Sequence, residues 1–561
     1  MKIFDAFLNA SFLFLCLLFV TGGFVPPGDA PHARLGEINQ LGPWTVGFLL
    51  LVAVRRLVDR RGTFGEIWFV RVLRALANRI AAMPGLVYLL TAVWALMLIA
   101  VAIQRHLAFD DNGDLAIFDQ AFWNTTHGVF LRSSLIPERS GEIILFADHF
   151  DPLQLALIPL YAIFPSPMLF LVVQSLALAL GAIPLYWLAR DRFPESPVLA
   201  AIFPVVYLLY LPLRGANRYD YHPSALVPPL LFLALYFMEK ARWPSMIVCL
   251  VLVGLLKENL PIAGVIIGLY LAFARGWRRL GLVVAIVFAL WTYAGFAWIV
   301  PAFSPDGRYP HFLRYAALGE APSHLLLAPL EHPMVLLSTL LTPARQKLGY
   351  LLWVFGPVVF LPLLSPFRLS LTLPFLAQNL LSTAPHQWNL QTHHSAELIP
   401  FVFFAALGGA TSALYWLDLT QTRLTASDVL RHRRALASAL LAGSFVFHGI
   451  PETFYLRAYA RTPRDGRLQS ALRMIPSGAS VSAWTKILPH TAHRRGLYRF
   501  PALGGDGIEG ATYVLVDEDL LPRTDRAMAA EALAALSAKG YERIFDRDGT
   551  VLFRRRANGK S

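Results

Sequence analysis

The chain has 561 residues, of which 56% are hydrophobic and only 15% are charged. This composition excludes an ordinary soluble protein and predicts a polytopic membrane protein, because apolar segments of membrane-spanning length recur along the chain. The net charge of +13 does not require a nucleic-acid partner, since cytoplasmic loops of membrane proteins carry an excess of Lys and Arg. Cys16 and Cys249 both lie in apolar segments, which predicts neither a disulfide framework nor a cysteine metal site.

Hydropathy predicts about thirteen transmembrane helices. They lie near residues 4–24, 43–54, 83–103, 167–189, 197–213, 223–239, 245–256, 260–274, 280–300, 348–364, 369–384, 396–416 and 436–451. The first is expected to be retained, because no small-residue signal-peptide cleavage site follows it. The apolar stretch 152–164 is short and contains Pro152 and Pro159, so we expect an interfacial helix there.

The basic loops all fall on one side of the membrane if the chain crosses it at each predicted span. They are the loop 55–82 and the segments 190–192, 239–242, 275–279 and 431–434. The positive-inside rule makes this side cytoplasmic, with the N-terminus inside and the C-terminus outside. The opposite side receives the segments 104–166, 214–223, 257–259, 301–347 and 386–394. Nearly every unusual polar residue of the membrane part lies in these segments, so the sequence places its chemistry on the extracytoplasmic face.

The composition changes near residue 452, where predicted spans stop. Segments 479–483, 511–518 and 541–556 have the pattern of strands, and 525–540 has the apolar repeat of an amphipathic helix. We therefore expect three regions. Residues 1–82 hold two extra N-terminal spans and a basic cytoplasmic loop, 83–451 form the membrane domain with a first large external loop at 104–166, and 452–561 form a small extracytoplasmic α/β domain.

The first candidate site lies in the segment FDDNGDLAIFDQAFWNTTHG, residues 109–128. Asp119 is flanked there by aromatic residues, and burial against them would raise the pKa of its carboxyl group. Asp119 is therefore a candidate general base. The other aspartates surround the turn signal Asn112-Gly113, where we expect them to be solvated, with Asp114 capping the next helix.

Two further groups follow on the same face. In ADHFDP (147–152), Asp148 and His149 could orient one another, bind a metal or bind a phosphate, although a plain polar loop also explains them. In NRYDYHP (217–223), Arg218 and His222 could contact an anionic head group, with Asp220 paired to either. The tyrosines of this segment are typical of an interfacial aromatic belt.

The segment LLKENLP (255–261) places Lys257 and Glu258 inside a hydrophobic stretch over 246–273. Ionisable residues at such depth cost a few kcal/mol, so they indicate function. The alternative is a Lys–Glu pair that turns a helical hairpin at the surface. In THHSAE (392–397), His393 and His394 point to different helix faces, and at most one of them needs to face a site.

These motifs, in this order, resemble a bacterial family of uncharacterised membrane proteins, domain-of-unknown-function family 2079. The matching segments are FDQAFWNTTHG, HFDPLQLALIPLYAIFPSP, LVVQSLALALGAIPLYWLAR, YDYHPSALVPPLL, KENLPIAGVIIGLYL, HHSAELIPFVFFAAL and IPSGASVSAWTKILPHTAHRRGLYRFP. The resemblance covers residues 83–555, and the first two spans are an addition to it.

That family is in turn similar to the GT-C membrane glycosyltransferases, which include protein O-mannosyltransferases and the aminoarabinose transferase of lipid A. The resemblance implies a GT-C-like polytopic α-helical fold and sugar transfer from a polyprenyl-phosphate donor to an unknown extracytoplasmic acceptor. Asp119 matches the catalytic base, and His149 matches the His of a His-Pro-Pro-Leu-like element. Gln120 stands where those enzymes carry a second acid, which puts metal dependence in doubt, so no cofactor is predicted and a divalent metal stays an alternative.

The same resemblance implies roles for the other candidates. Lys257, Arg218 and His222 would contact the leaving phosphate, and Glu258 would hold Lys257 in place. Asp148 and His149 would orient the acceptor or the base. The remaining candidates for substrate binding are Gln120, Asp220, His393 and His394.

Other functions fit the sequence as well. Lys257 and Glu258 could be the coupling pair of a transporter or flippase for a lipid-linked or anionic solute. A non-catalytic receptor or assembly factor would use the polar motifs structurally, and a zinc site of Asp119, His149 and His222 has sensible ligand types. The expected partners are membrane lipid and a polyprenyl-phosphate-linked sugar, with no nucleic acid. The expected location is the bacterial inner membrane.

Overall fold

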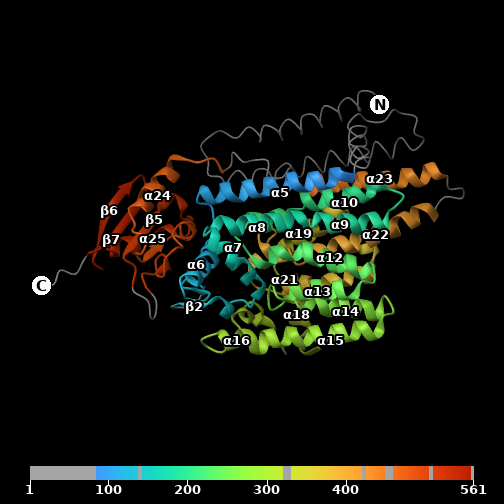
Figure 1. The fold of residues 1–561 in the computed structure, drawn as a ribbon, viewed down its shortest axis with the longest axis horizontal. Helices are drawn as coiled ribbons and strands as arrows, with labels where there is room; N and C mark the ends of the chain where they lie inside the picture. Colours follow the sequence, from blue (N-terminus) through green and yellow to red (C-terminus); the bar gives the residue numbers. More distant parts are fainter. Residues whose placement is uncertain are drawn as a thin grey trace, which may run out of the picture.

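The computed structural model describes residues 84–136, 142–319, 330–419, 425–448, 459–504 and 510–556. The predicted spans near 4–24 and 43–54 and the basic loop 55–82 lie outside these residues. Long helices run side by side in a bundle, and a sheet domain formed by the C-terminal part of the chain stands at one end of it (Figure 1).

Five described helices are long and apolar enough to cross a membrane. They span Gly85–Leu107, Pro167–Arg192, Pro197–Arg218, Arg278–Phe303 and Ile399–Leu419. Shorter apolar helices span Pro152–Ile163, Pro223–Glu239, Trp243–Gly254 and Ile262–Phe273. The prediction of a helical membrane protein is confirmed, whereas the count of about thirteen spans is not established by the described residues.

The helices follow the chain in this order, and all except α11 and α20 are labelled in Figure 1. The first half contains α5 (Pro84–Leu107), α6 (Asp114–Thr126), α7 (Ile158–Ile163), α8 (Pro167–Leu180), α9 (Ala182–Arg192), α10 (Pro197–Leu209), α11 (Leu211–Arg218), α12 (Val227–Glu239) and α13 (Trp243–Gly254). The second half contains α14 (Ile262–Phe273), α15 (Arg278–Ala294), α16 (Val300–Phe303), α18 (Pro333–Leu341), α19 (Ala344–Phe355), α20 (Pro366–Leu369), α21 (Leu373–Leu380), α22 (Ile399–Leu419) and α23 (Ala426–His448).

The predicted span 348–364 is not one continuous helix. α19 ends at Phe355, and the chain then turns through Val359 and Phe360, whose φ angles are 46° and 56°. Pro357 contributes to this break, because it lacks the N–H group that would continue the helix. The predicted span 369–384 is likewise divided between α20 and α21. The interfacial helix expected at 152–164 is a 3-10 turn (Pro152–Leu157) followed by α7.

The C-terminal region forms a five-stranded mixed sheet in the order β4-β3-β5-β7-β6. Its strands are β3 (Val481–Ala483), β4 (Leu497–Arg499), β5 (Tyr513–Asp517), β6 (Tyr541–Arg547) and β7 (Thr550–Arg555). β3 pairs in parallel with β4 and β5, while β7 pairs antiparallel with β5 and β6. The domain also contains α24 (Pro463–Arg473) and α25 (Arg526–Ala535). β4 was absent from the sequence prediction, because its three residues lie among Arg and Gly.

The sheet domain and the first loop after α5 share one hydrophobic core. Leu115 and Phe122 of α6, Phe146 of the loop, and Val514 and Leu552 of the sheet are buried in the same cluster. The short pair β1 (Arg132–Ser133) and β2 (Ile143–Ile144) lies in this loop. Burial of this shared core fixes the sheet domain against α6. Residues from the C-terminal region can therefore contribute to a site at this end of the bundle.

Candidate functional site

The start of α6 is held by a buried carboxylate from a distant part of the chain. Asp220 Oδ1 accepts hydrogen bonds from Arg105 Nη2 and from the backbone N–H of Asn112, each at 2.9 Å. Its Oδ2 accepts the N–H of Leu115, also at 2.9 Å. Arg105 lies 3.3 Å from Asp111 as well. Asp220, predicted to bind substrate, thus positions α6, because its oxygens satisfy backbone donors of the first turn.

Asp114 is the first residue of α6 and faces the adjacent segment 219–222. Its Oδ2 lies 3.7 Å from His222 Nε2, and Tyr219 hydrogen-bonds to the same carboxyl group. Burial and then the charge of Asp220 raise the pKa of Asp114 to about 7, against the opposing effects of Arg499 and Tyr219. A carboxyl group with this pKa exchanges protons near neutral pH, as a general acid or base must.

The expected capping role of Asp114 is wrong. The N-cap of α6 is Gly113, whose φ of 96° is a left-handed conformation, and no side chain caps this helix locally. Gly113 also packs against Thr485 of the C-terminal region, where a β-carbon would lie 2.7 Å from the Thr485 methyl group. Asp220 supplies the capping interactions instead, so the Asp114 carboxyl group is free to face His222.

Glu258 connects the loop between α13 and α14 to the first external loop. Its Oε1 accepts hydrogen bonds from His149 Nδ1 at 2.9 Å and Tyr309 Oη at 2.7 Å, and its Oε2 accepts the Phe150 N–H at 3.0 Å. An ionised carboxylate only accepts hydrogen bonds, so Nδ1 of His149 carries the proton and Nε2 keeps a lone pair. Glu258 therefore orients His149, and it makes no hydrogen bond to Lys257 among the described residues.

Asp148 and His149 meet His311, which lies far along the chain. His311 Nε2 is 3.2 Å from Asp148 Oδ1, and the rings of His149 and His311 stack with centroids 4.3 Å apart. Each of these three residues offers one ligand atom, and the three atoms lie within 4.8 Å of one another. With Glu258 behind His149, the group has the carboxylate–histidine arrangement of protein metal sites. These are the residues near Lys257 that suit a divalent cation.

The zinc set considered from the sequence, Asp119, His149 and His222, is not one of the metal-ligand clusters of the described residues. A second such cluster, His106, Asp111 and His490, joins the end of α5 to the C-terminal region. In that cluster the His106 Nδ1 lies 2.6 Å from Asp111 Oδ2, and the two imidazole rings stack at 4.2 Å.

Neutral histidines surround the candidate site. His222 stacks on His393 with ring centroids 3.5 Å apart, and His393 contacts His394 at 4.0 Å. Burial lowers the pKa of His222 to about 3, with a further contribution from the charge of Lys257. Burial and then Lys257 lower the pKa of His149 to about 4 and that of His394 well below its usual value. Both adjacent histidines, rather than one, lie at this site.

Lys257 is the residue that these groups share. Its side chain is 8% exposed, and its ammonium group has no hydrogen bond or ion pair within 4.0 Å across the described ranges of the chain. Its charge acts on histidines from three other segments and on Glu397. Glu397 is itself held by Ser224 and Asn259 at 3.3 and 3.2 Å. The structure thus brings together the predicted groups at 148–149, 222, 257–258 and 393–394.

Asp119 lies outside this group. Its Oδ1 accepts a hydrogen bond from Tyr161 Oη at 2.5 Å, and its Oδ2 is 3.2 Å from His493 Nε2 of the C-terminal region. The preceding residue, Phe118, is the one whose ring contacts His222, at 5.8 Å. The assignment of Asp119 as the base stays a prediction, and its contacts link α6 to the sheet domain.

Gln120 also connects α6 to its surroundings. Its Oε1 accepts hydrogen bonds from Ser133 Oγ and the Ser134 N–H at 2.8 and 2.9 Å, and its Nε2 donates to the carbonyls of Arg494 and Arg495 at 2.9 Å. The amide therefore has no donor or acceptor left for the substrate that the sequence analysis assigned to it. Arg218 ends α11 and is half-buried.

Sequence reasoning missed several residues that contribute to the site. Tyr309 and His311 lie in a long loop without a recognisable motif, and Arg499 lies in the short strand β4. The segment 485–499, which supplies Arg499 and His493, was conspicuous only through its resemblance to a family. Their contacts with the first loop depend on how the C-terminal region docks, which local sequence does not reveal.

The described helices and this polar group define a polytopic helical membrane protein with a candidate site at the end of the bundle that carries the sheet domain (Figure 1). The sequence profile described as "Predicted membrane protein (DUF2079)" matches residues 109–552. This match covers more than half of the chain, and the chain belongs to that family. The membership expected from the sequence is thereby confirmed. No curated protein matches the chain.

The solved structures similar to this one include two of ArnT from Cupriavidus metallidurans. The structure bound to undecaprenyl phosphate matches with a TM-score of 0.49 and 13% sequence identity, and the match covers 84% of this chain and 98% of the ArnT chain. The apo structure matches with a TM-score of 0.41 and 14% sequence identity, and the match covers 82% of this chain and 98% of the ArnT chain.

The opposite pKa shifts of two aspartates give a testable pair of variants. Asp114 has a folded-state pKa raised from 3.8 to about 7, so ionisation destabilises the folded state increasingly as pH rises from about 4 to 7. Although burial opposes its charge, His149 and His311 hold the pKa of Asp148 well below its usual value. That carboxylate therefore stabilises the fold above pH 4, and the contribution is lost in acid.

We predict that Asp114→Asn raises the thermal unfolding midpoint at pH 8 and that Asp148→Asn lowers it. The effect of Asp114→Asn should shrink as the pH approaches 4, because the wild-type carboxyl group is then protonated in the folded state. The effect of Asp148→Asn should stay nearly constant over the same range, because the folded-state pKa of Asp148 lies well below its usual value and the carboxylate keeps its charge. Thermal unfolding of the detergent-purified chain between pH 4.5 and 8 measures this. Equal destabilisation by both variants would contradict the electrostatic description of the site.

Proposed function

We propose that this protein transfers a sugar from a polyprenyl-phosphate donor to an acceptor at the extracytoplasmic face of a bacterial inner membrane. The proposal combines the implied chemistry of the family resemblance with one observation: Lys257 is only 8% exposed, and its ammonium group has no hydrogen-bond partner among the described residues. An uncompensated charge at such a position is costly. A phosphate group of the donor would provide the missing charge and acceptor oxygens.

The surroundings of Lys257 suit a leaving phosphate. His149, His222 and His394 are neutral near pH 7, so none of them binds Lys257 as a carboxylate would. The N–H groups of His149 and His222 already donate to Glu258 and to the Asp220 carbonyl, so His394 would be the histidine that donates to the phosphate. Glu258, the closest acid in sequence, is occupied by three donors. When the bond between the anomeric carbon and the phosphate oxygen breaks, the phosphate departs with the electron pair, and Lys257 stabilises the added negative charge.

Asp114 is the base that the contacts favour. In its ionised form it would take the proton of the acceptor hydroxyl as that oxygen forms the new bond to the anomeric carbon. Its contact with His222 joins it to the group around Lys257, whereas Asp119 is engaged by Tyr161 and His493. Asp148, His149 and His311 would orient the acceptor, or hold a divalent cation that adds positive charge beside the phosphate.

The membrane orientation belongs to the same proposal. The group around Lys257 lies at the end of the bundle near the sheet domain, so we place both outside the cytoplasm, as the basic loops predict. The sheet domain supplies Arg499, whose charge acts on Asp114. It would therefore take part in forming the acceptor side of the site.

Replacing Lys257 tests donor binding. Lys257→Met keeps the length and apolar stem of the side chain and should fold normally, because removal of an unpaired buried charge is neutral or stabilising. We predict that the affinity of the purified chain for undecaprenyl phosphate, measured by native mass spectrometry, falls at least about tenfold, the effect of one charge-assisted hydrogen bond. Lys539→Met, on the surface of the sheet domain, is the matched control. Unchanged binding by Lys257→Met would refute the role of this residue.

A turnover assay separates the two aspartates of α6. Membranes that contain the protein are supplied with polyprenyl-phosphate-linked sugars, and the release of undecaprenyl phosphate is measured. Loss of a general base costs roughly a hundredfold or more, so Asp114→Asn should lose turnover while remaining folded. Asp119→Asn should retain most of it. The reverse result, with Asp119→Asn inactive and Asp114→Asn active, would restore Asp119 as the base. If the protein moved a lipid-linked solute without consuming the donor, a transporter would replace the proposed transferase.

A further inference from the structure

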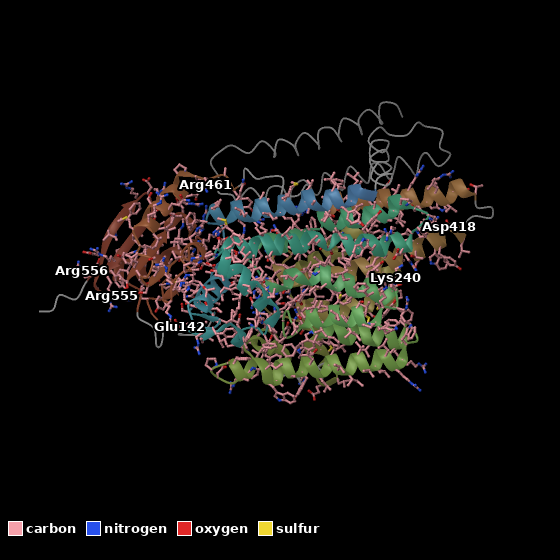
Figure 2. The ribbon with its side chains drawn as sticks, viewed as in Figure 1. Glu142, Lys240, Asp418, Arg461, Arg555 and Arg556 are labelled. Atoms are coloured by element: carbon pink, nitrogen blue, oxygen red, sulfur yellow. The ribbon has the colours of Figure 1, made fainter. Side chains whose placement is uncertain are left out.

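Two adjoining hollows lie at the end of the bundle away from the sheet domain. Their volumes are about 210 and 320 Å³, and Arg192 and Arg368 line both of them. Lys240 lines the first hollow. Figure 2 shows Lys240 and Asp418 at the opposite end of the molecule from Arg461 and Arg555 of the sheet domain. This is the end that the basic loops predict to be cytoplasmic, so these hollows are separate from the candidate site around Lys257.

Arg368 is a largely buried cation whose positive charge is only weakly neutralised by a neighbouring carboxylate. Its side chain is 10% exposed, and its guanidinium group stacks on the Phe404 ring, 4.6 Å from the centroid. Its carboxylate neighbour, Glu239, is 3.7 Å away, and Glu239 lies closer to Arg275, at 3.1 Å. In the described parts of the chain, Arg368 makes no hydrogen bond with its side chain. Arginine has five N–H donors, and Arg368 lines both hollows, so its donors can reach a ligand that enters them.

Arg192 adds a second guanidinium group to the same hollows. Its Nε donates to Thr411 Oγ1 at 2.8 Å, and its two terminal nitrogens have no hydrogen-bond acceptor within the described residues. Gly408 leaves room for Arg368, because a β-carbon there would lie 2.7 Å from Arg368 Cδ and 2.8 Å from Nη1. Two guanidinium groups with unused donors thus converge on one space, where their like charges repel unless an anion lies between them.

The chemistry of the second hollow is that of an anion site. Besides the arginines, its lining contains hydroxyl groups and no carboxylate; the hydroxyl residues are Ser365, Thr411, Ser412 and Tyr415. The two acids of the first hollow are both neutralised, Asp191 by Lys240 at 2.8 Å and Glu239 by Arg275. The hydroxyl groups of Thr411 and Ser412 donate to the Leu407 and Gly408 carbonyls, so the donors for a ligand come mainly from the paired guanidinium groups. Such a pair matches the oxygens of a phosphate better than those of any neutral ligand.

We propose that these hollows bind the phosphate group of an anionic membrane lipid. Exposed aromatic side chains next to the arginines favour a lipid over a free phosphate as the ligand. They are Trp416, Tyr415 and Phe367, which are 64%, 61% and 73% exposed. Aromatic side chains gather at the level of lipid head groups, and basic pockets between membrane helices on the cytoplasmic side bind anionic head groups. This site is independent of the proposed transferase function.

The experiment titrates the detergent-purified full chain with phosphatidylglycerol, with phosphatidylcholine and with inorganic phosphate at constant ionic strength, and follows the thermal unfolding midpoint. The variants are Arg192→Gln and Arg368→Gln. Arg433→Gln is the control, because Arg433 pairs with Glu195 at 2.9 Å and does not line either hollow. Lys257→Met separates this site from the donor site.

We expect phosphatidylglycerol to raise the midpoint of the wild type, Arg433→Gln and Lys257→Met. Arg192→Gln and Arg368→Gln should need at least about tenfold more lipid, because each loses charge-assisted hydrogen bonds to the phosphate. If Arg368→Gln fails to fold, the response of Arg192→Gln to the lipid decides the result, because Arg192 is exposed and its replacement should not affect folding. Protection by inorganic phosphate with the same variant dependence supports the phosphate site with a free anion as the ligand. An equal response of all variants, or no response to either anion, overturns the proposal.

Discussion

The arrangement of the candidate site depends on one buried carboxylate, that of Asp220. It neutralises Arg105 and accepts two backbone N–H groups at the start of α6, all at 2.9 Å. A buried ion pair stabilises only when its remaining hydrogen-bonding capacity is used, and here the backbone of α6 uses it. The carboxylate thereby fixes the rotation and position of α6. Together with the hydrophobic core that α6 shares with the sheet domain, this attachment positions Asp114 and Asp119.

The two sides of α6 consequently face different parts of the protein. Positions 114 and 119 differ by five residues, which places them about 140° apart around a helix of 3.6 residues per turn. Asp114 therefore faces His222, and Asp119 and Gln120 face Tyr161 and the C-terminal region. The negative charge of Asp220 that anchors the helix also raises the pKa of Asp114. The structural anchor and the proposed base are thus coupled electrostatically.

Part of this could be predicted from the sequence. Apolar length identified a helical membrane protein, and the gathering of polar motifs in segments expected on one face made Lys257, His149 and His222 candidates for a common site. Of His393 and His394, the sequence analysis expected at most one to face a site. The rest required tertiary information. Hydrophobic flanks marked Asp119 as unusual, but they could not show which aspartate faces the site, because the rotation of the helix depends on Asp220, which is 105 residues away from Leu115 in the sequence. The contribution of His311 and Arg499 likewise depends on docking, and the breaks after Phe355 show that apolar runs do not reveal helix continuity.

The most direct test of the central claim is an experimental structure of the protein with undecaprenyl phosphate. The account predicts the phosphate within hydrogen-bonding distance of Lys257 Nζ, among His149, His222 and His394, with the lipid chain leading into the membrane. A phosphate found only elsewhere, for example at Arg368, with the Lys257 ammonium group still without a ligand, would contradict it.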